Sequence, residues 1–169
     1  MDSSRSRPRL FVENHPTRLI AEALLRPYDF ESEEAWTMSG ALGSAQSSLE
    51  AHPEIPVVFL FNMKTEDPIQ TQEWRRSVER QLSRSAPNGW LVVPVTPRLD
   101  AWALTDPRIK KDFETNGAPK LYAERAARIV ELTRKHPFDP TELLRTNDDF
   151  RKLVEFLRQH APQPAAATR

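Results

Sequence analysis

The chain has no cysteine among its 169 residues, which excludes disulfide bonds, thiolate metal sites and a cysteine nucleophile. It has only four glycines, too few to supply the glycine-rich phosphate cradles of P-loop or dinucleotide-binding proteins. Nucleotide binding by those two routes is therefore not expected. The longest apolar runs have the length of a strand, so the sequence predicts no transmembrane span.

The chain also lacks net charge, because 24 basic residues balance 24 acidic ones. No overall electrostatic field therefore draws it to nucleic acid or to an anionic membrane. Residues 1–8 are polar and lack the apolar core of a secretory signal, so the cytoplasm is the expected location. The length and the 38% hydrophobic content predict one soluble domain.

Fifteen prolines punctuate a chain in which strand-like and helix-like segments alternate. The residue patterns predict strands at 10–13, 57–61 and 90–95, and a weaker one at 35–39. Helical patterns lie at 17–26, 42–51 and 67–84. The last of these helices is expected to start with Asp67 as its N-cap and Pro68 as its first residue.

The alternation predicts an α/β fold with about four mostly parallel strands and helices on both faces. After Pro97 the pattern is helical, with breaks near 116–117, 136–137 and 146–147, so the C-terminal third (about 100–160) should be helical. We expect a flexible N-terminus at 1–8, a single domain at 9–160 and a disordered tail at 161–169.

Polar side chains follow three of the predicted strands, at the edge where chemistry is usually placed in open α/β sheets. They are Glu13 with Asn14 and His15, then Asn62 with Lys64, Glu66 and Asp67, then Asp100 with Asp106. A purely structural interpretation also exists, because acidic residues often cap helices. On that view Glu13 only ends a strand, while Asp67 and Asp100 cap the helices that follow them.

Three segments in order resemble the Toprim fold, which topoisomerases, primases and overcoming-lysogenization-defect nucleases share. Residues 10–14 resemble its opening strand and glutamate motif, and 57–68 resemble its strand that ends in Asp-x-Asp. The segment from Asp100 through Ala101-Trp102-Ala103-Leu104 to Asp106-Pro107 is similar to a motif of small stand-alone bacterial members. The resemblance implies a three-layer sandwich, and partners in bacterial defence or mobile-element systems, an ATPase among them.

The departures from this family concern the metal site. The paired aspartates, which the family uses to bind magnesium, are replaced by Asn62 and Lys64, and Asn14 replaces the glycine after Glu13. Asn is a weaker ligand than Asp for a hard cation, and a lysine repels one. Glu13, Asn62, Lys64 and Asp100 are thus expected to be vestigial motif positions, with no metal site and no cofactor, in a non-catalytic binding or regulatory component.

Three alternatives stay open from the sequence. The first is a magnesium-dependent nuclease or phosphoryl-transfer enzyme with a rearranged metal site, built from Glu13, Glu66, Asp67, Asp100 and Asp106. The second is a metal-independent phosphodiester activity that uses Lys64, His15 and Glu13. The third is an oligomerisation module that uses the helical C-terminal third. The oligomeric state itself has no signal in the sequence.

Candidate partner surfaces follow from charged and aromatic residues. Arg76, Arg80 and Arg84 recur every four residues and form one stripe on the predicted helix. The stripe is either a solvated face or a contact for an acidic protein partner or nucleic acid. Of the four tryptophans, Trp36, Trp90 and Trp102 are expected to be partly buried anchors, and Trp74 is the candidate for a partner surface.

Overall fold

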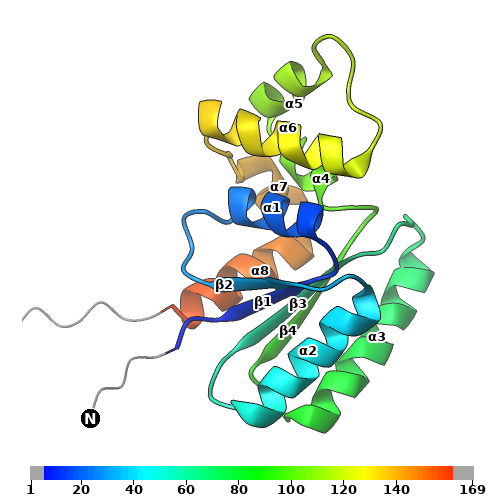
Figure 1. Ribbon diagram of the computed structural model, residues 1–169, viewed down its shortest axis with the longest axis vertical. Helices are drawn as coiled ribbons and strands as arrows, with labels where there is room; N and C mark the ends of the chain where they lie inside the picture. Colours follow the sequence, from blue (N-terminus) through cyan, green and yellow to red (C-terminus); the bar gives the residue numbers. More distant parts are fainter. Residues whose placement is uncertain (1–5, 162–169) are drawn as a thin grey trace, which may run out of the picture.

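The computed structural model describes residues 6–161; the predictions for residues 1–5 and for the tail at 162–169 lie outside them. Its centre is a four-stranded, all-parallel sheet with the strand order β2-β1-β3-β4 (Figure 1). The strands are β1 (Arg9–Val12), β2 (Glu31–Glu34), β3 (Val57–Asn62) and β4 (Trp90–Val95). The predicted α/β fold is confirmed, and the sheet is wholly rather than mostly parallel.

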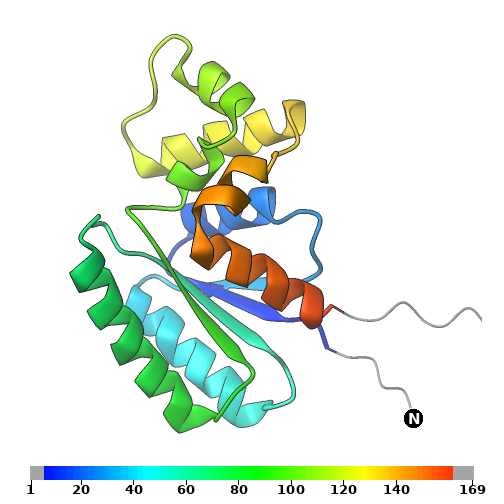
Figure 2. The same cartoon turned by 180° about the vertical axis from the view of Figure 1, so that it is seen from behind.

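Helices cover both faces of the sheet and make three layers. On one face, α2 (Met38–Ala51) packs against β1 and β3, and α3 (Pro68–Ser85) packs against β4. On the opposite face lie α1 (His15–Leu24), which contacts β1, and α8 (Asp148–Gln159), which contacts β4. Figures 1 and 2 show these two layers from opposite sides.

The central strand β3 explains why both faces need cover, since all six of its residues are buried. Val58 and Leu60 belong to the core under α1 and α8, whereas Phe59 and Phe61 belong to the core under α2 and α3. Alternate residues of a strand point to opposite faces, so a continuous apolar run is what a strand between two helical layers requires.

The C-terminal third is helical, as predicted, and its breaks fall between the observed helices. These are α4 (Asp100–Ala103), α5 (Pro107–Glu114), α6 (Tyr122–Lys135) and α7 (Thr141–Thr146). α6 packs along α1, and α5 packs on α6, so this part stacks beyond the α1 layer (Figure 1). Phe113 and Ile129 join the same core as the sheet residues, which makes the helical part a continuation of that core.

The weaker strand prediction at 35–39 is wrong. The strand is β2 at Glu31–Glu34, while Thr37 accepts a hydrogen bond from the Gly40 amide and caps α2. β2 is an edge strand paired only with β1, so exposed glutamates are tolerated there and no apolar pattern marks it. No helix within residues 6–161 is long and apolar enough to cross a membrane.

Candidate functional site

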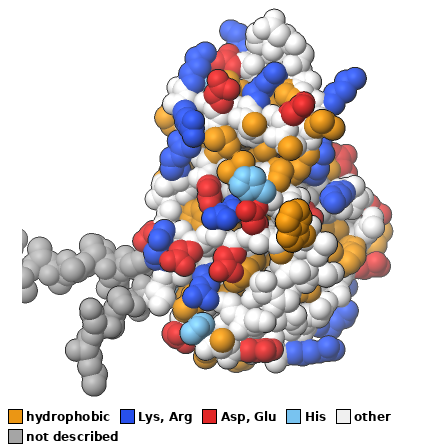
Figure 3. Space-filling view, in the orientation of Figure 1, with side chains coloured by type: hydrophobic (Ala, Val, Ile, Leu, Met, Phe, Trp, Pro, Cys, Tyr) orange, Lys and Arg blue, Asp and Glu red, His pale blue; other side chains and the backbone are white. Residues whose placement is uncertain are grey.

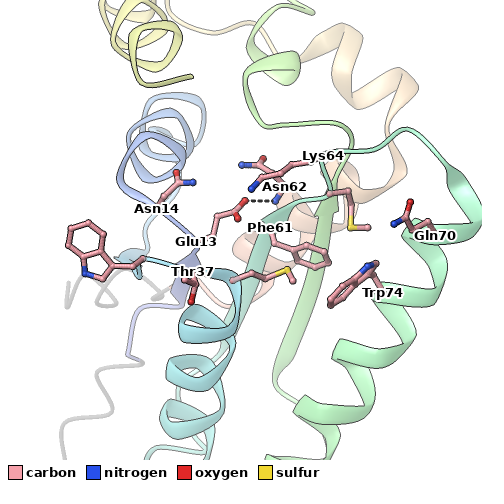
Figure 4. A pocket seen from close by; sticks show the side chains of 11 residues that line it. Glu13, Asn14, Thr37, Phe61, Asn62, Lys64, Gln70 and Trp74 are labelled. Atoms are coloured by element: carbon pink, nitrogen blue, oxygen red, sulfur yellow. Dashed lines mark hydrogen bonds between the residues drawn. The ribbon is translucent and has the colours of Figure 1, made fainter. Parts of the chain in front are cut away.

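A cleft of about 480 Å³ opens where β1 and β3 end, beside the first turns of α2 and α3. Figure 4 shows Glu13 and Asn62 at the ends of β1 and β3, with Gln70 and Trp74 across the cleft on α3. Trp36, Met38, Met63 and Lys64 also line this cleft. The structure thus brings three of the four predicted motif positions, Glu13, Asn62 and Lys64, to one cavity.

Glu13 lies at the buried end of the cleft, with 6% of its surface exposed. Its Oε1 accepts a hydrogen bond of 3.0 Å from the backbone amide of Asn62, which ties the end of β1 to the end of β3. Among the described residues no basic side chain forms a salt bridge with this carboxylate. Glu13 is therefore a buried carboxylate held by one backbone hydrogen bond and paired with no basic side chain.

The Asn62 side chain bonds entirely within the protein. Its Oδ1 accepts a 2.8 Å hydrogen bond from the Leu99 amide. Its Nδ2 donates to the hydroxyls of Thr17, at 3.0 Å, and Tyr122, at 3.3 Å. Since both donors and the acceptor are engaged, this amide joins β3 to α1, to α6 and to the segment before α4.

Tyr122 completes this network, because its hydroxyl also lies 2.9 Å from the hydroxyl of Thr17. Burial raises the pKa of the Tyr122 phenol, and the negative charges of Asp100 and Glu13 act in the same direction. The hydrogen bonds from Thr17 and Asn62 oppose that rise in pKa. The network is consequently neutral at physiological pH.

Asp100, the fourth motif position, is neutralised inside the protein. It is 3% exposed, and its Oδ2 accepts a 2.6 Å hydrogen bond from Nε of Arg125 on α6. Arg98 lies at 3.8 Å from the other carboxylate oxygen. The prediction that Asp100 caps the following helix is wrong, because Leu99 occupies the N-cap position and no side chain caps α4. The carboxylate instead links α4 to α6.

Lys64 is positioned by its backbone. Its amide donates to the Pro97 carbonyl at 2.8 Å, and its φ of 58° places it in the left-handed region, which is uncommon for a residue other than glycine. The side chain is exposed at the rim of the cleft and forms no ion pair within residues 6–161. The cleft thus carries the buried Glu13 carboxylate and the exposed Lys64 side chain, which form no ion pair with each other.

The other acidic candidates serve helix ends or the surface. Asp67 accepts a 2.9 Å bond from the Ile69 amide, so its predicted role as the N-cap of α3 is confirmed. Asp106 is buried and accepts from the amides of Arg108 and Asp139. Glu66 is exposed outside the cleft lining.

The rearranged metal site is therefore not assembled. No group of three or more His, Asp or Glu side chains between residues 6 and 161 is placed to hold a metal ion. The residues at the strand ends do not fit magnesium, because the Asn62 amide and the Asp100 carboxylate are both engaged internally. His15 lies 3.0 Å from Glu34 and is not part of the cleft lining, so it does not join Glu13 and Lys64.

The predicted arginine stripe lies on the outer face of α3. Arg76, Arg80 and Arg84 are all exposed, and none has an ion pair among the described residues. Their neighbour Arg75 points the other way and binds Asp149 at 2.7 Å. The side chains of the stripe are thus free for a partner, which leaves the choice between a solvated face and a contact unchanged.

The tryptophan prediction is wrong for Trp36, which is 100% exposed in the loop between β2 and α2. Trp74 is 40% exposed at the cleft, as a partner-surface residue would be, and Trp102 is buried. The error has a physical cause, since a residue after a polar edge strand has no layer beneath it to cover its ring. Hydrophobic side chains gather across the middle of the face shown in Figure 3.

Sequence reasoning missed Thr17, Tyr122 and Arg125, which satisfy Asn62 and Asp100. Thr17 carried one local signal, because it lies on the buried face of an amphipathic helix, where a hydroxyl needs a partner. Tyr122 and Arg125 come from a helix far along the chain and carried none. Comparison with protein-family models, with curated proteins and with solved structures gives no match to this chain.

Proposed function

We propose that the protein is a degenerate Toprim-like domain that acts as a non-catalytic binding component and engages a protein partner through the cleft. The observation that carries the proposal is the Asn62 amide, whose two N–H groups and oxygen all bond within the protein. In the Toprim family, which the chain resembles, the position equivalent to Asn62 supplies a metal-binding carboxylate. Here it supplies a joint between β3 and two helices instead.

The charges at the strand ends support the same proposal. Metal-assisted phosphoryl transfer needs several carboxylates turned toward one ion. Of the two acidic residues at Toprim-like motif positions, Glu13 lines the cleft, whereas Asp100 is paired with Arg125 at 2.6 Å. The ammonium of Lys64 lines the same cleft and disfavours a divalent cation.

The cleft itself has the features of a protein-binding surface. Trp36 is fully exposed and Trp74 is 40% exposed, and both line the same cavity. Exposed tryptophans are unfavourable in water and are enriched among residues that dominate binding energy. The third interpretation, oligomerisation through the C-terminal third, is less well supported, since the apolar face of α8 is used in the protein's own core.

Manganese tests the absence of catalysis, because this paramagnetic ion broadens NMR signals near its binding site. We expect no saturable broadening of the Glu13 or Asp100 amides, and no nuclease activity above that of Glu13→Ala. A double variant, Asn62→Asp with Lys64→Asp, serves as the positive comparison because it restores both carboxylates. Saturable broadening at Glu13 in the wild type, together with cleavage lost in Glu13→Ala, would overturn the proposal.

A photo-crosslinking amino acid at position 36 tests the partner surface inside the cell in which the protein naturally occurs. We expect a discrete cross-linked species from position 36 and none from position 114, a matched exposed site on α5. Trp74→Ala should abolish the species, since it removes the opposite wall of the cleft without touching position 36. Equal cross-linking from both positions would contradict a specific cleft.

A further inference from the structure

We propose that the cleft recognises the guanidinium group of an arginine side chain presented by a protein partner, with Glu13 as the residue that binds it. This inference rests on the function proposed above and names the chemistry of the partner. The protein buries three acidic side chains within residues 6–161, Glu13, Asp100 and Asp106, which are 6%, 3% and 1% exposed.

Two of these three acids have a basic partner within the protein. Asp100 binds Arg125 at 2.6 Å, and Asp106 lies 3.5 Å from Arg108 and accepts two backbone amides. Glu13 has only the Asn62 amide. A buried carboxylate without a counter-charge is unfavourable. A cation from a partner that pairs with Glu13 therefore stabilises it, as Arg125 stabilises Asp100.

The walls of the cleft suit a guanidinium better than a small hydrated ion. Trp74, Phe61, Met38 and Met63 line the cleft together with Glu13, and Figure 4 shows Phe61 and Trp74 on the α3 side of it. Guanidinium is planar and weakly hydrated, and it stacks on aromatic rings while it donates two parallel hydrogen bonds to a carboxylate. The volume of about 480 Å³ lies in the usual range of ligand sites and exceeds what one side chain fills.

Lys64 and the first turn of α2 also border the cleft and by themselves would favour an anion. An anion, however, would have to lie beside the uncompensated charge of Glu13. The exposed Lys64 side chain is better placed to meet an acidic residue next to the arginine. The cleft therefore favours a partner segment in which an arginine is flanked by aspartate or glutamate.

Trp36 gives this segment a second contact. It borders both the main cleft and a neighbouring hollow of about 310 Å³, which Pro16 and Ala35 also line. Its ring is wholly exposed, so the rest of the partner segment has an apolar surface to cover next to the arginine pocket.

The test uses the indole N–H signals of the four tryptophans in NMR titrations of the whole chain. The probes are Nα-acetyl-arginine amide and its neutral isostere Nα-acetyl-citrulline amide. We expect saturable shifts of the Trp74 indole with the arginine probe only. Trp102 is buried, and the Trp90 indole donates to the Ala86 carbonyl, so both serve as internal controls.

Glu13→Gln keeps an oxygen that can accept from Asn62 but removes the charge. It should weaken binding of the arginine probe about tenfold or more, as expected for loss of one charge-assisted pair. Glu66→Gln, which removes an exposed carboxylate outside the cleft, should leave the affinity unchanged. Lys64→Met should strengthen binding of this probe, because it removes a like charge from the rim.

A parallel titration with magnesium separates the two proposals. If arginine shifts Trp74 and magnesium does not bind, both are supported. If neither binds, or if citrulline binds as well as arginine, the arginine pocket is overturned while the non-catalytic function stands. Saturable magnesium binding at Glu13 would overturn the proposed function itself.

Discussion

The carboxyl edge of the sheet has two halves that treat polar groups in opposite ways. The closed half consists of two bonded sets, in which Asn62, Thr17 and Tyr122 bond to one another and Asp100 bonds to Arg125. The open half consists of Glu13, Lys64, Trp36 and Trp74. There a buried carboxylate has no basic partner among the described residues, and two indole rings are exposed. The halves meet at Asn62, whose backbone amide serves Glu13 and whose side chain serves the closed half.

This difference separates polar groups that are satisfied within the protein from polar and aromatic groups that are not. Satisfied buried networks stabilise one conformation, whereas exposed aromatic rings and uncompensated charges favour binding to something else. The closed half should therefore matter for stability and the open half for binding. Stability measurements on matched variants test that division.

The largest effect is expected from Asn62→Ala. It leaves the Leu99 amide and the hydroxyls of Thr17 and Tyr122 without their common partner. We expect the free energy of unfolding to fall by about 3 kcal/mol, because the Leu99 amide becomes an unsatisfied buried donor and the two hydroxyls keep only the bond between them. Urea denaturation followed by tryptophan fluorescence measures this. Lys64→Ala, two residues along, is the control and should change little; a similar loss there would erase the division.

Arg125→Met should have the next largest effect, since it leaves Asp100 buried and without its close partner. Arg98, at 3.8 Å, retains part of the compensation. We expect a loss of about 2 kcal/mol, below the full cost of an uncompensated buried charge. Adding Asp100→Asn to the same chain should restore part of the loss, and a double variant no better than the single one would show that the charge is not the cause.

The strands and helix starts of the fold show what a sequence can and cannot predict. The apolar runs at 57–61 and 90–95 fixed two strands, because burial on both faces leaves a local pattern. Asp67 and Pro68 marked the start of α3, because a helix cap is a local signal that acts over one turn. β2 was not predicted, because an edge strand made mostly of glutamates has no such apolar pattern.

The sequence predicted where the candidate site lies but not what each of its residues does. Glu13, Asn62 and Lys64 end adjacent strands, and parallel strands bring such residues to one edge. What each does depends on distant partners. Asn62 meets Thr17 and Tyr122, 45 and 60 residues away, and Asp100 meets Arg125, 25 residues away. Those pairings arise from the packing of α6 on α1 and on α4, which no local spacing encodes.

Tyr122 gives a pH-dependent test of the closed half. Burial raises the pKa of its phenol above the unfolded value of about 10, so the unfolded chain releases this proton first. The contribution of the neutral phenol is complete below about pH 10 and falls as the pH rises toward the folded pKa. Tyr122→Phe should cost about 1 kcal/mol at pH 8. That difference from the wild type should shrink at pH 10.5, and a constant difference would contradict the assignment.

The smallest effect, and the one with the opposite sign, is expected from Glu13→Gln. The amide oxygen of glutamine can still accept from the Asn62 amide, while the uncompensated charge disappears. We expect the free energy of unfolding to stay unchanged or to rise by up to about 1 kcal/mol, because removing a buried charge without a partner relieves a desolvation cost. Asp100→Asn is the matched control, and it should lower stability because it strands Arg125. A loss of stability in Glu13→Gln as large as that of Asp100→Asn would place Glu13 in the closed half.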